Sequence, residues 1–169
     1  TLAGLGEGVV AYYLGNYTQA LKELAPLAEQ GDAMAQSLLG EMYYKGRGVS
    51  QDHQQALSWF RKAAEQGNSL GQFGLGVAYN EGQGVPQDYQ QAAFWFHKAA
   101  EKGHPSAQYN LGLMYFNGKG VPQDYKQATS FFHKAAEKGN VDAQNNLGFA
   151  YEKGKGVPQD YQQAVSWFR

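Results

Sequence analysis

The stretch GDAMAQSLLGEMYYKGRGVSQDHQQALSWFRKAAEQ, residues 31–66, decides the fold, because its pattern recurs every 36 residues through most of the chain. Glycines keep this spacing at two positions of the pattern, and tyrosines keep it at a third. They are Gly31, Gly67, Gly103 and Gly139; Gly40, Gly76, Gly112 and Gly148; and Tyr43, Tyr79, Tyr115 and Tyr151. A period between about 20 and 50 residues is typical of a solenoid, in which each repeat is one supersecondary unit stacked on the next.

Each repeat predicts two helices joined by a glycine-rich loop. In the quoted stretch, helix A covers residues 33–45 and helix B covers residues 53–66. Asp32 precedes helix A and can accept hydrogen bonds from the free N–H groups of the first turn. Gly46 follows helix A and can supply a left-handed cap. Asp52, with a glutamine three residues later, predicts a variant capping box at helix B.

The apolar residues of each helix recur with the helical period and predict one buried face per helix. On helix A they are Ala35, Leu39, Met42 and Tyr43, and on helix B they are His53, Ala56, Trp59, Phe60, Ala63 and Ala64. Large aromatic rings opposite alanines allow helices to pack closely. Gly40 lies inside helix A, where glycine costs about 1 kcal/mol relative to alanine. Its recurrence in four repeats therefore indicates a close helix contact.

Composition excludes several classes of protein. The net charge of −1 gives no general attraction to phosphates or anionic lipids, so we expect no nucleic-acid partner. No run approaches the roughly 20 apolar residues that a membrane-spanning helix needs, so we expect no membrane insertion. The absence of cysteine excludes disulfides and thiolate metal sites.

No motif in the sequence predicts a catalytic residue, a cofactor or a metal site. Loops such as GKGVPQD are glycine-rich but lack the spacing of a phosphate-binding loop. His97 and His133 take equivalent outer positions on successive B helices, which raises the alternative of a bridging metal. Arg61 and Arg169 occupy the same position, so we interpret it as a solvated site and expect neither enzyme activity nor a bound cofactor.

The repeat motif A-x-x-x-L-G-x-x-Y-x-x-G-x-G-V-x-x-D-x-x-x-A-x-x-W/F-F-x-x-A-A-x-x-G closely resembles the Sel-1-like repeat family, a branch of the tetratricopeptide-type helical repeats. The resemblance implies an all-α fold: a right-handed α–α superhelical solenoid that acts as a protein-binding scaffold or adaptor. Bacterial members of the family often sit in the cell envelope or are exported. Some carry a cysteine pair in each repeat, and this chain has none.

We expect a single repeat domain over residues 1–169 with an atypical first unit. Gly8 and Gly40 are only 32 residues apart, because a short GNY turn replaces the longer loop. The predicted units are a tetratricopeptide-like first unit at 1–30, full units at 31–66, 67–102 and 103–138, and a partial unit at 139–169.

The two ends of the sequence carry further expectations. Trp167 and Phe168 should face a following half-helix, so we expect the native chain to continue past Arg169 or another molecule to cover this end. The first unit begins almost at residue 1, as it would after removal of a leader. This favours a periplasmic, envelope or secreted location over the cytoplasm.

The face of helix A opposite its core stripe is the predicted partner-binding site, because the family resemblance places it in the concave groove. The predicted groove residues are Leu5, Val9, Tyr12, Tyr13, Tyr44, Phe73, Val77, Asn80, Tyr109, Leu113, Phe116, Asn117, Asn145 and Phe149. Apolar and aromatic residues on a face without core neighbours usually mark an interaction site. The alternative is that stacking buries Phe73, Tyr109 and Phe149 against adjacent A helices.

These residues lead to two functional hypotheses. The first is a non-enzymatic interaction module that binds a peptide or helix of a partner protein in the groove. The second is an assembly module that associates with itself through the C-terminal end.

Overall fold

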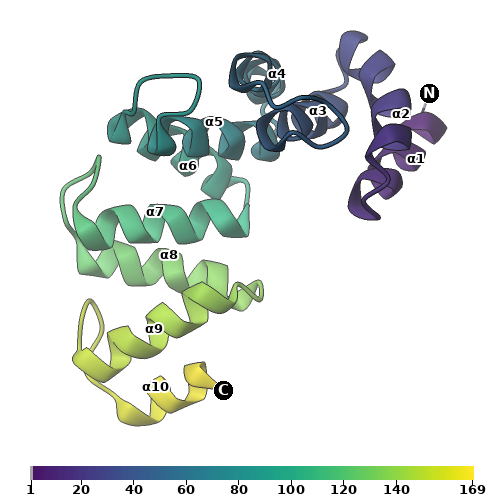
Figure 1. Ribbon diagram of the computed structural model, residues 1–169. Helices are drawn as coiled ribbons and strands as arrows, with labels where there is room; N and C mark the ends of the chain where they lie inside the picture. The colour runs from purple at the N-terminus through teal and green to yellow at the C-terminus, as the bar shows by residue number, and fades with distance from the viewer. Residues whose placement is uncertain (1) are drawn as a thin grey trace. The chain divides into compact units, whose positions relative to one another are not determined.

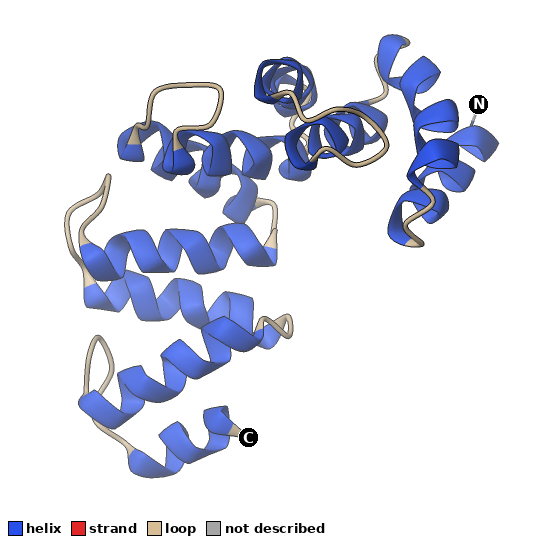
Figure 2. Cartoon of the chain, viewed as in Figure 1, coloured by secondary structure: helices blue, strands red, loops and turns tan. Residues whose placement is uncertain are grey.

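The computed structural model describes residues 2–169, with side chains from Ala3 onward, and every regular element in this part of the chain is an α-helix (Figures 1 and 2). The helices are α1 (Leu2–Tyr13), α2 (Tyr17–Glu29), α3 (Ala33–Lys45), α4 (His53–Glu65), α5 (Ser69–Glu81), α6 (Tyr89–Glu101), α7 (Pro105–Asn117), α8 (Tyr125–Glu137), α9 (Val141–Lys153) and α10 (Tyr161–Phe168). The odd-numbered helices are the A helices and the even-numbered helices are the B helices. The predicted all-α repeat is confirmed, and the predicted bounds of α3 agree with the structure.

The chain divides into two compact units, which we describe separately. The first ends at Gln87 and contains α1 to α5, coloured purple to teal in Figure 1. In it, α3 packs against both α4 and α5, and α1 packs against α2 and α3. The second begins at Asp88 and contains α6 to α10, coloured teal to yellow. In it, α7 packs against α6 and α8, and α9 packs against α8 and α10.

The A helices begin and end as the sequence predicts. The Asp32 side chain accepts a hydrogen bond from the Ala35 N–H at 2.8 Å. His104 replaces the acid in a later repeat, and its Nδ1 accepts from the Ala107 N–H at 3.2 Å. Gly46 ends α3 with φ of 65°, a left-handed conformation that glycine adopts without the steric cost of a Cβ.

The predicted capping box at the B helices forms only in part. The Asp52 side chain accepts from the Gln55 N–H at 3.0 Å, as expected. However, the Asp52 N–H donates to the Tyr43 carbonyl at 2.9 Å, where a capping box would use the glutamine side chain. The same backbone bond recurs from Asp124 to Tyr115. It joins the starts of α4 and α8 to the ends of the preceding A helices.

Loop glutamines make a second link that the sequence analysis did not identify. The Gln51 side-chain amide donates to the Tyr44 carbonyl at 2.9 Å, and Gln123 donates to the Phe116 carbonyl at the same distance. Gln87 and Gln159 make the equivalent bonds in their repeats. Because the last carbonyls of a helix have no partner within it, these bonds satisfy groups that would otherwise depend on water.

Buried glutamines connect successive repeats. The Gln36 Nε2 in α3 donates to the Ala28 carbonyl at the end of α2, at 3.1 Å. Gln108 repeats this bond to Ala100 at 3.3 Å in the second unit. Gln36 and Gln108 are each only 4% exposed. A buried amide that loses its partner is costly, so these bonds fix the position of one hairpin on the next.

The core follows the predicted stripes with corrections at the edges. Ala56, Phe60 and the alanines that follow them on helix B are buried as expected. Trp59 is only half-buried, contrary to the prediction, whereas Leu57 is 1% exposed; His53, at the edge of the stripe, is half-buried. Leu57 is covered because the loop of the next repeat lies over it; a Cβ added to Gly84 would be 2.7 Å from its Cδ1.

Gly40 lies directly against the Phe60 ring, which is 3% exposed. A methyl group at this position would lie 2.7 Å from the Phe60 Cδ1 and 3.2 Å from the Ala56 carbonyl oxygen. We therefore expect Gly40→Ala to lower the free energy of unfolding by about 1–3 kcal/mol, because overpacking outweighs the helix propensity of alanine. Urea unfolding followed by circular dichroism measures the change.

Gly6 in α1 is the matched control, because a Cβ there meets no atom within 4 Å. Gly6→Ala should raise the free energy of unfolding by up to about 1 kcal/mol. Equal stabilisation by both substitutions would contradict the close glycine–phenylalanine contact.

Candidate partner-binding site

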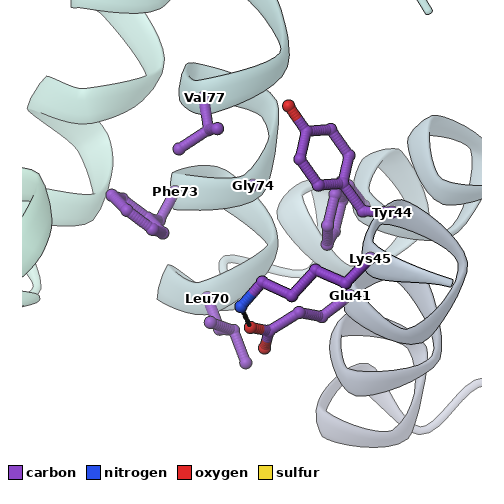
Figure 3. A pocket seen from close by; sticks show the side chains of 8 residues that line it. Glu41, Tyr44, Lys45, Leu70, Phe73, Gly74 and Val77 are labelled. Atoms are coloured by element: carbon purple, nitrogen blue, oxygen red, sulfur yellow. Dashed lines mark hydrogen bonds and ion pairs between the residues drawn. The ribbon is translucent and has the colours of Figure 1, made fainter. Parts of the chain in front are cut away.

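The first compact unit contains a hollow between the A helices α3 and α5, with a cavity of about 80 Å³. Figure 3 shows it from close by, with the Tyr44 ring extending from α3 toward α5. The residues that line this first hollow are Glu41, Tyr44, Lys45, Phe60, Leu70, Phe73, Gly74 and Val77. Phe60 belongs to the B helix α4, so the buried ring that packs on Gly40 also lines the hollow.

Polar groups around the first hollow are paired within the chain. Lys45 forms an ion pair with Glu41 one turn earlier on the same helix. The Tyr44 hydroxyl donates to the Glu81 carboxylate at 2.5 Å. Burial raises the pKa of Tyr44, and the hydrogen bond to Glu81 and its negative charge raise it further. The hollow therefore presents an apolar surface whose charges already have partners.

The second compact unit contains a larger hollow between the A helices α7 and α9, with a cavity of about 350 Å³. The residues that line this second hollow are Leu113, Phe116, Asn117, Phe132, Asn146, Phe149, Ala150, Lys153 and Lys155. Phe149 is 55% exposed and packs edge-on against Phe168, with ring centroids 5.2 Å apart. The Lys155 ammonium lies 5.5 Å from the Phe116 ring centroid and 5.1 Å from that of Tyr125.

The two hollows occupy equivalent positions, two repeats apart. Tyr44 corresponds to Phe116, Val77 to Phe149, and the buried Phe60 to Phe132. Each hollow thus combines the last turn of one A helix, the middle of the next, and the phenylalanine of the intervening B helix. The repeat itself therefore generates the hollow, and the side chains of each repeat set its size and charge.

The structure brings together seven of the predicted groove residues. Tyr44, Phe73 and Val77 line the first hollow. Leu113, Phe116, Asn117 and Phe149 line the second. Phe73 is half-buried, as the stacking alternative anticipates in part, whereas Phe149 stays exposed.

Three further predicted residues, Asn80, Tyr109 and Asn145, line neither hollow. Tyr109 is half-buried and packs against the core of the second unit, with its ring centroid 6.0 Å from that of Phe132. Burial and the charge of Asp142 raise the pKa of Tyr109, while a hydrogen bond from Asn146 lowers it. Asn145 is exposed, and its neighbour Asn146 takes the place in the hollow.

Of the four predicted groove residues in α1, one is exposed. Tyr13 is 72% exposed, whereas Leu5 and Val9 are half-buried and pack against the core. Tyr12 was placed on the wrong face, because it is 5% exposed and belongs to the core cluster. Its hydroxyl accepts a hydrogen bond from Arg47 Nη1 at 3.4 Å.

Arg47 lies in the loop of the following repeat, which explains why periodicity within α1 does not reveal that Tyr12 is covered. Burial raises the pKa of Tyr12, and the nearby Glu41 charge raises it further. Tyr17, the first residue of α2, packs edge-on against Tyr12 with ring centroids 5.7 Å apart, so the start of α2 also covers the Tyr12 ring.

Sequence reasoning missed the two buried phenylalanines as lining residues, because it assigned them to the core alone. It also missed Lys155, which comes from a loop outside the helical pattern. The only signal for Lys155 is the basic residue that recurs at this loop position, as Arg47 and Lys119.

Other chemistry is limited in the part of the chain that the structure describes. No three His, Cys, Asp or Glu side chains among residues 2–169 gather closely enough to hold a metal ion. His97 and His133 instead contact acids on their own helices, with Nδ1 3.4 Å from the carboxylates of Glu101 and Glu137. None of the described helices combines the length and the apolar character that crossing a bilayer requires.

The fold and the two hollows define a helical-repeat protein with apolar sites between neighbouring A helices. The Sel1 repeat model matches residues 33–68, 69–104, 105–140 and 141–169. The chain therefore belongs to the Sel1 repeat family, and the resemblance noted in its sequence is confirmed. No curated protein sequence matches the chain.

Solved structures of Sel1 repeat proteins share the fold. A protective antigen of uropathogenic Escherichia coli is 42% identical with a TM-score of 0.87, and the match covers 98% of this chain and 36% of that one. A Sel1 repeat protein from Oxalobacter formigenes is 35% identical with a TM-score of 0.88, covering 97% and 65%. Cysteine-rich protein B of Helicobacter pylori is 29% identical with a TM-score of 0.60, covering 75% and 93%. The chain thus spans between about a third and two thirds of the first two relatives.

Membership of the family confirms the fold class and gives the role that such repeats commonly have. The fold class predicted from the sequence, an all-α solenoid of Sel1-like repeats, is confirmed. Sel1 repeats commonly mediate protein–protein interaction, and the family is generally a non-enzymatic scaffold.

The hydrogen bond between Tyr44 and Glu81 generates a pH dependence. Tyr44 should keep its proton in the folded chain above the usual tyrosine pKa, whereas the unfolded chain releases it near pH 10. Its contribution to the free energy of unfolding is therefore fully present below about pH 10 and is lost as the pH rises further.

Alkaline absorbance titration should show that Glu81→Gln moves one late-ionising tyrosine to lower pH. Tyr44→Phe identifies that tyrosine, and an unchanged titration of Glu81→Gln would contradict the assignment.

Proposed function

We propose that the chain is a non-enzymatic interaction module that holds a peptide or a helix of a partner protein on its A-helix faces. The observation that carries this proposal is the second hollow, where an apolar cavity of about 350 Å³ lies beside a phenylalanine that is 55% exposed. Pockets of roughly 300 Å³ and above are of the size that accepts a ligand group. This cavity therefore suits one large apolar side chain of a partner.

The binding free energy at the second hollow should come from several side chains that each contribute a little, and not from one residue alone. Full burial of a phenylalanine side chain contributes about 1.5–3 kcal/mol, so covering the exposed half of Phe149 contributes on the order of 1 kcal/mol. Leu113 and Phe116 are half-buried and add smaller areas. A partner that lies along both α7 and α9 can add such increments within the second unit. An extended peptide or a helix has the shape to do so.

The outer faces of the B helices support the assignment by contrast. Serine stands at one outward position in three repeats, as Ser58, Ser130 and Ser166. Such a polar face is stable in water without a partner. The exception is Phe94 in α6, which stands at the serine position and is 50% exposed. It supplies a matched control for the hollow.

Phe149→Ser should reduce recovery of the native partner about fivefold, the equivalent of about 1 kcal/mol, if Phe149 is a binding anchor. Phe94→Ser should leave recovery unchanged, because it exposes a comparable ring on the outer face. Both substitutions replace rings that are half in water, so both variants should keep the helicity of the parent. The measurement is affinity purification with each variant as bait, followed by titration of the recovered protein. Equal loss in both variants, or loss only in Phe94→Ser, would assign the partner to another face.

Self-association through α10 is the second candidate, favoured by exposed apolar residues on that helix. Tyr161 is 64% exposed and Val165 is 50% exposed, and both line a shallow hollow with Arg169. Sedimentation velocity separates the two candidates. Partner binding on the A helices predicts a monomer at micromolar concentration. A dimer that Val165→Ser dissociates would establish the assembly role instead.

A further inference from the structure

The two hollows carry opposite charge at equivalent positions. Glu81 closes α5 beside the first hollow, and Lys153 occupies the same position at the end of α9 in the second. Gln83 in the first corresponds to Lys155 in the second. The backbone arrangement is the same, so the difference lies in the chemistry that each hollow offers to a ligand.

Each charged group in or beside the first hollow already has a partner within the chain. Glu41 pairs with Lys45, and Glu81 accepts the hydroxyl of Tyr44. A charged ligand group would have to compete with these bonds and would gain little. The first hollow therefore offers no unpaired charged group to a partner.

The lining of the second hollow contains two lysines and no carboxylate. Glu152, the next residue along α9, pairs with Lys153 at 2.7 Å but does not line the hollow. Lys155 has no carboxylate within ion-pair distance among the residues that the structure describes. Its ammonium instead rests over the rings of Phe116 and Tyr125, which holds the charge at the edge of the apolar cavity.

We propose that the second hollow binds an acidic segment of a partner protein, with a large apolar side chain in the cavity and a flanking carboxylate against Lys155. Lys153 lines the same cavity but already pairs with Glu152, so Lys155 supplies the unpaired charge. This inference rests on the proposed function and specifies the chemistry of the partner. Charge complementarity at the edge of an interface contributes mainly to specificity and association rate, so the acidic flank selects the segment and the apolar group holds it.

Two capped pentapeptides test this inference directly: acetyl-Gly-Asp-Phe-Asp-Gly-amide and its neutral counterpart acetyl-Gly-Asn-Phe-Asn-Gly-amide. They have nearly the same shape and differ in charge. Each is titrated into the isotope-labelled chain and followed by the amide resonances of Leu113, Asn146 and Phe149. We expect saturable shifts at these residues, with a dissociation constant about twofold to fivefold lower for the acidic peptide. The preference should shrink as salt is added.

Two lysine substitutions test whether the preference for the acidic peptide arises in the second hollow. Lys155→Gln should bring the ratio of the two dissociation constants close to one. Lys119→Gln is the matched control, because Lys119 holds the same loop position one repeat earlier and lies 5.3 Å from the Tyr89 ring centroid, yet does not line the hollow. It should leave the ratio unchanged.

Several results would overturn the inference. Equal affinity for both peptides would show a hollow that accepts an apolar group without regard to charge, and the proposed function would stand. If the preference for the acidic peptide persists in Lys155→Gln, the charge effect arises elsewhere. The same conclusion follows if Lys119→Gln also removes the preference. Absence of any shift in the hollow would exclude it as the binding site for such segments. The Phe149→Ser experiment with the native partner would then decide the proposed function independently.

Discussion

The contact between a B-helix phenylalanine and an A-helix glycine is the constraint on which the rest of the structure depends. The Phe60 ring lies against Gly40, Phe132 against Gly112 and Phe168 against Gly148, each so close that a Cβ on the glycine would come within 2.8 Å of the ring. Glycine in the middle of a helix is less stable than alanine there by about 1 kcal/mol. The close packing of an aromatic ring on bare backbone offsets that cost. Two of these rings also line the hollows, so the same contact that holds a hairpin together shapes its candidate binding site.

Hydrogen bonds of polar groups fix the spacing between hairpins, and they recur from repeat to repeat as the glycine–phenylalanine contact does. Left-handed glycines end the A helices, loop glutamines bind the last A-helix carbonyls, and buried glutamines bind the end of the preceding B helix. Each of these bonds satisfies a backbone group that the hairpin leaves free. Because they recur with the repeat, the end of one A helix and the middle of the next have the same arrangement in the pair α3 and α5 and in the pair α7 and α9. Variation at those few positions changes the hollow without changing the fold.

Much of the fold could be predicted from the sequence, because the signals for it are local. Caps such as Asp32 and Gly46 fix the helix ends, and the helical period fixes which face of each helix is apolar. What periodicity does not determine is which neighbour covers a face. Tyr12 and Leu57 are buried by loops of the following repeat, which lie more than 25 residues further along the chain. Trp59, predicted as core, is only half-buried.

The candidate site shows the same division between local and non-local signals. Tyr44 and Phe116 were predictable as side chains on the outward face of helix A, and both line hollows. Lys155 was not predictable, because its role depends on a loop passing over the end of the preceding hairpin. The charge difference between the hollows emerges only when Glu81 and Lys153 are seen at equivalent positions beside cavities.

A crystal structure of the chain bound to its native partner tests the central claim most directly. We predict that an apolar side chain of the partner occupies the cavity between α7 and α9, in contact with Phe132 and Phe149. A partner seated on the outer faces of the B helices, with that cavity empty, would contradict it.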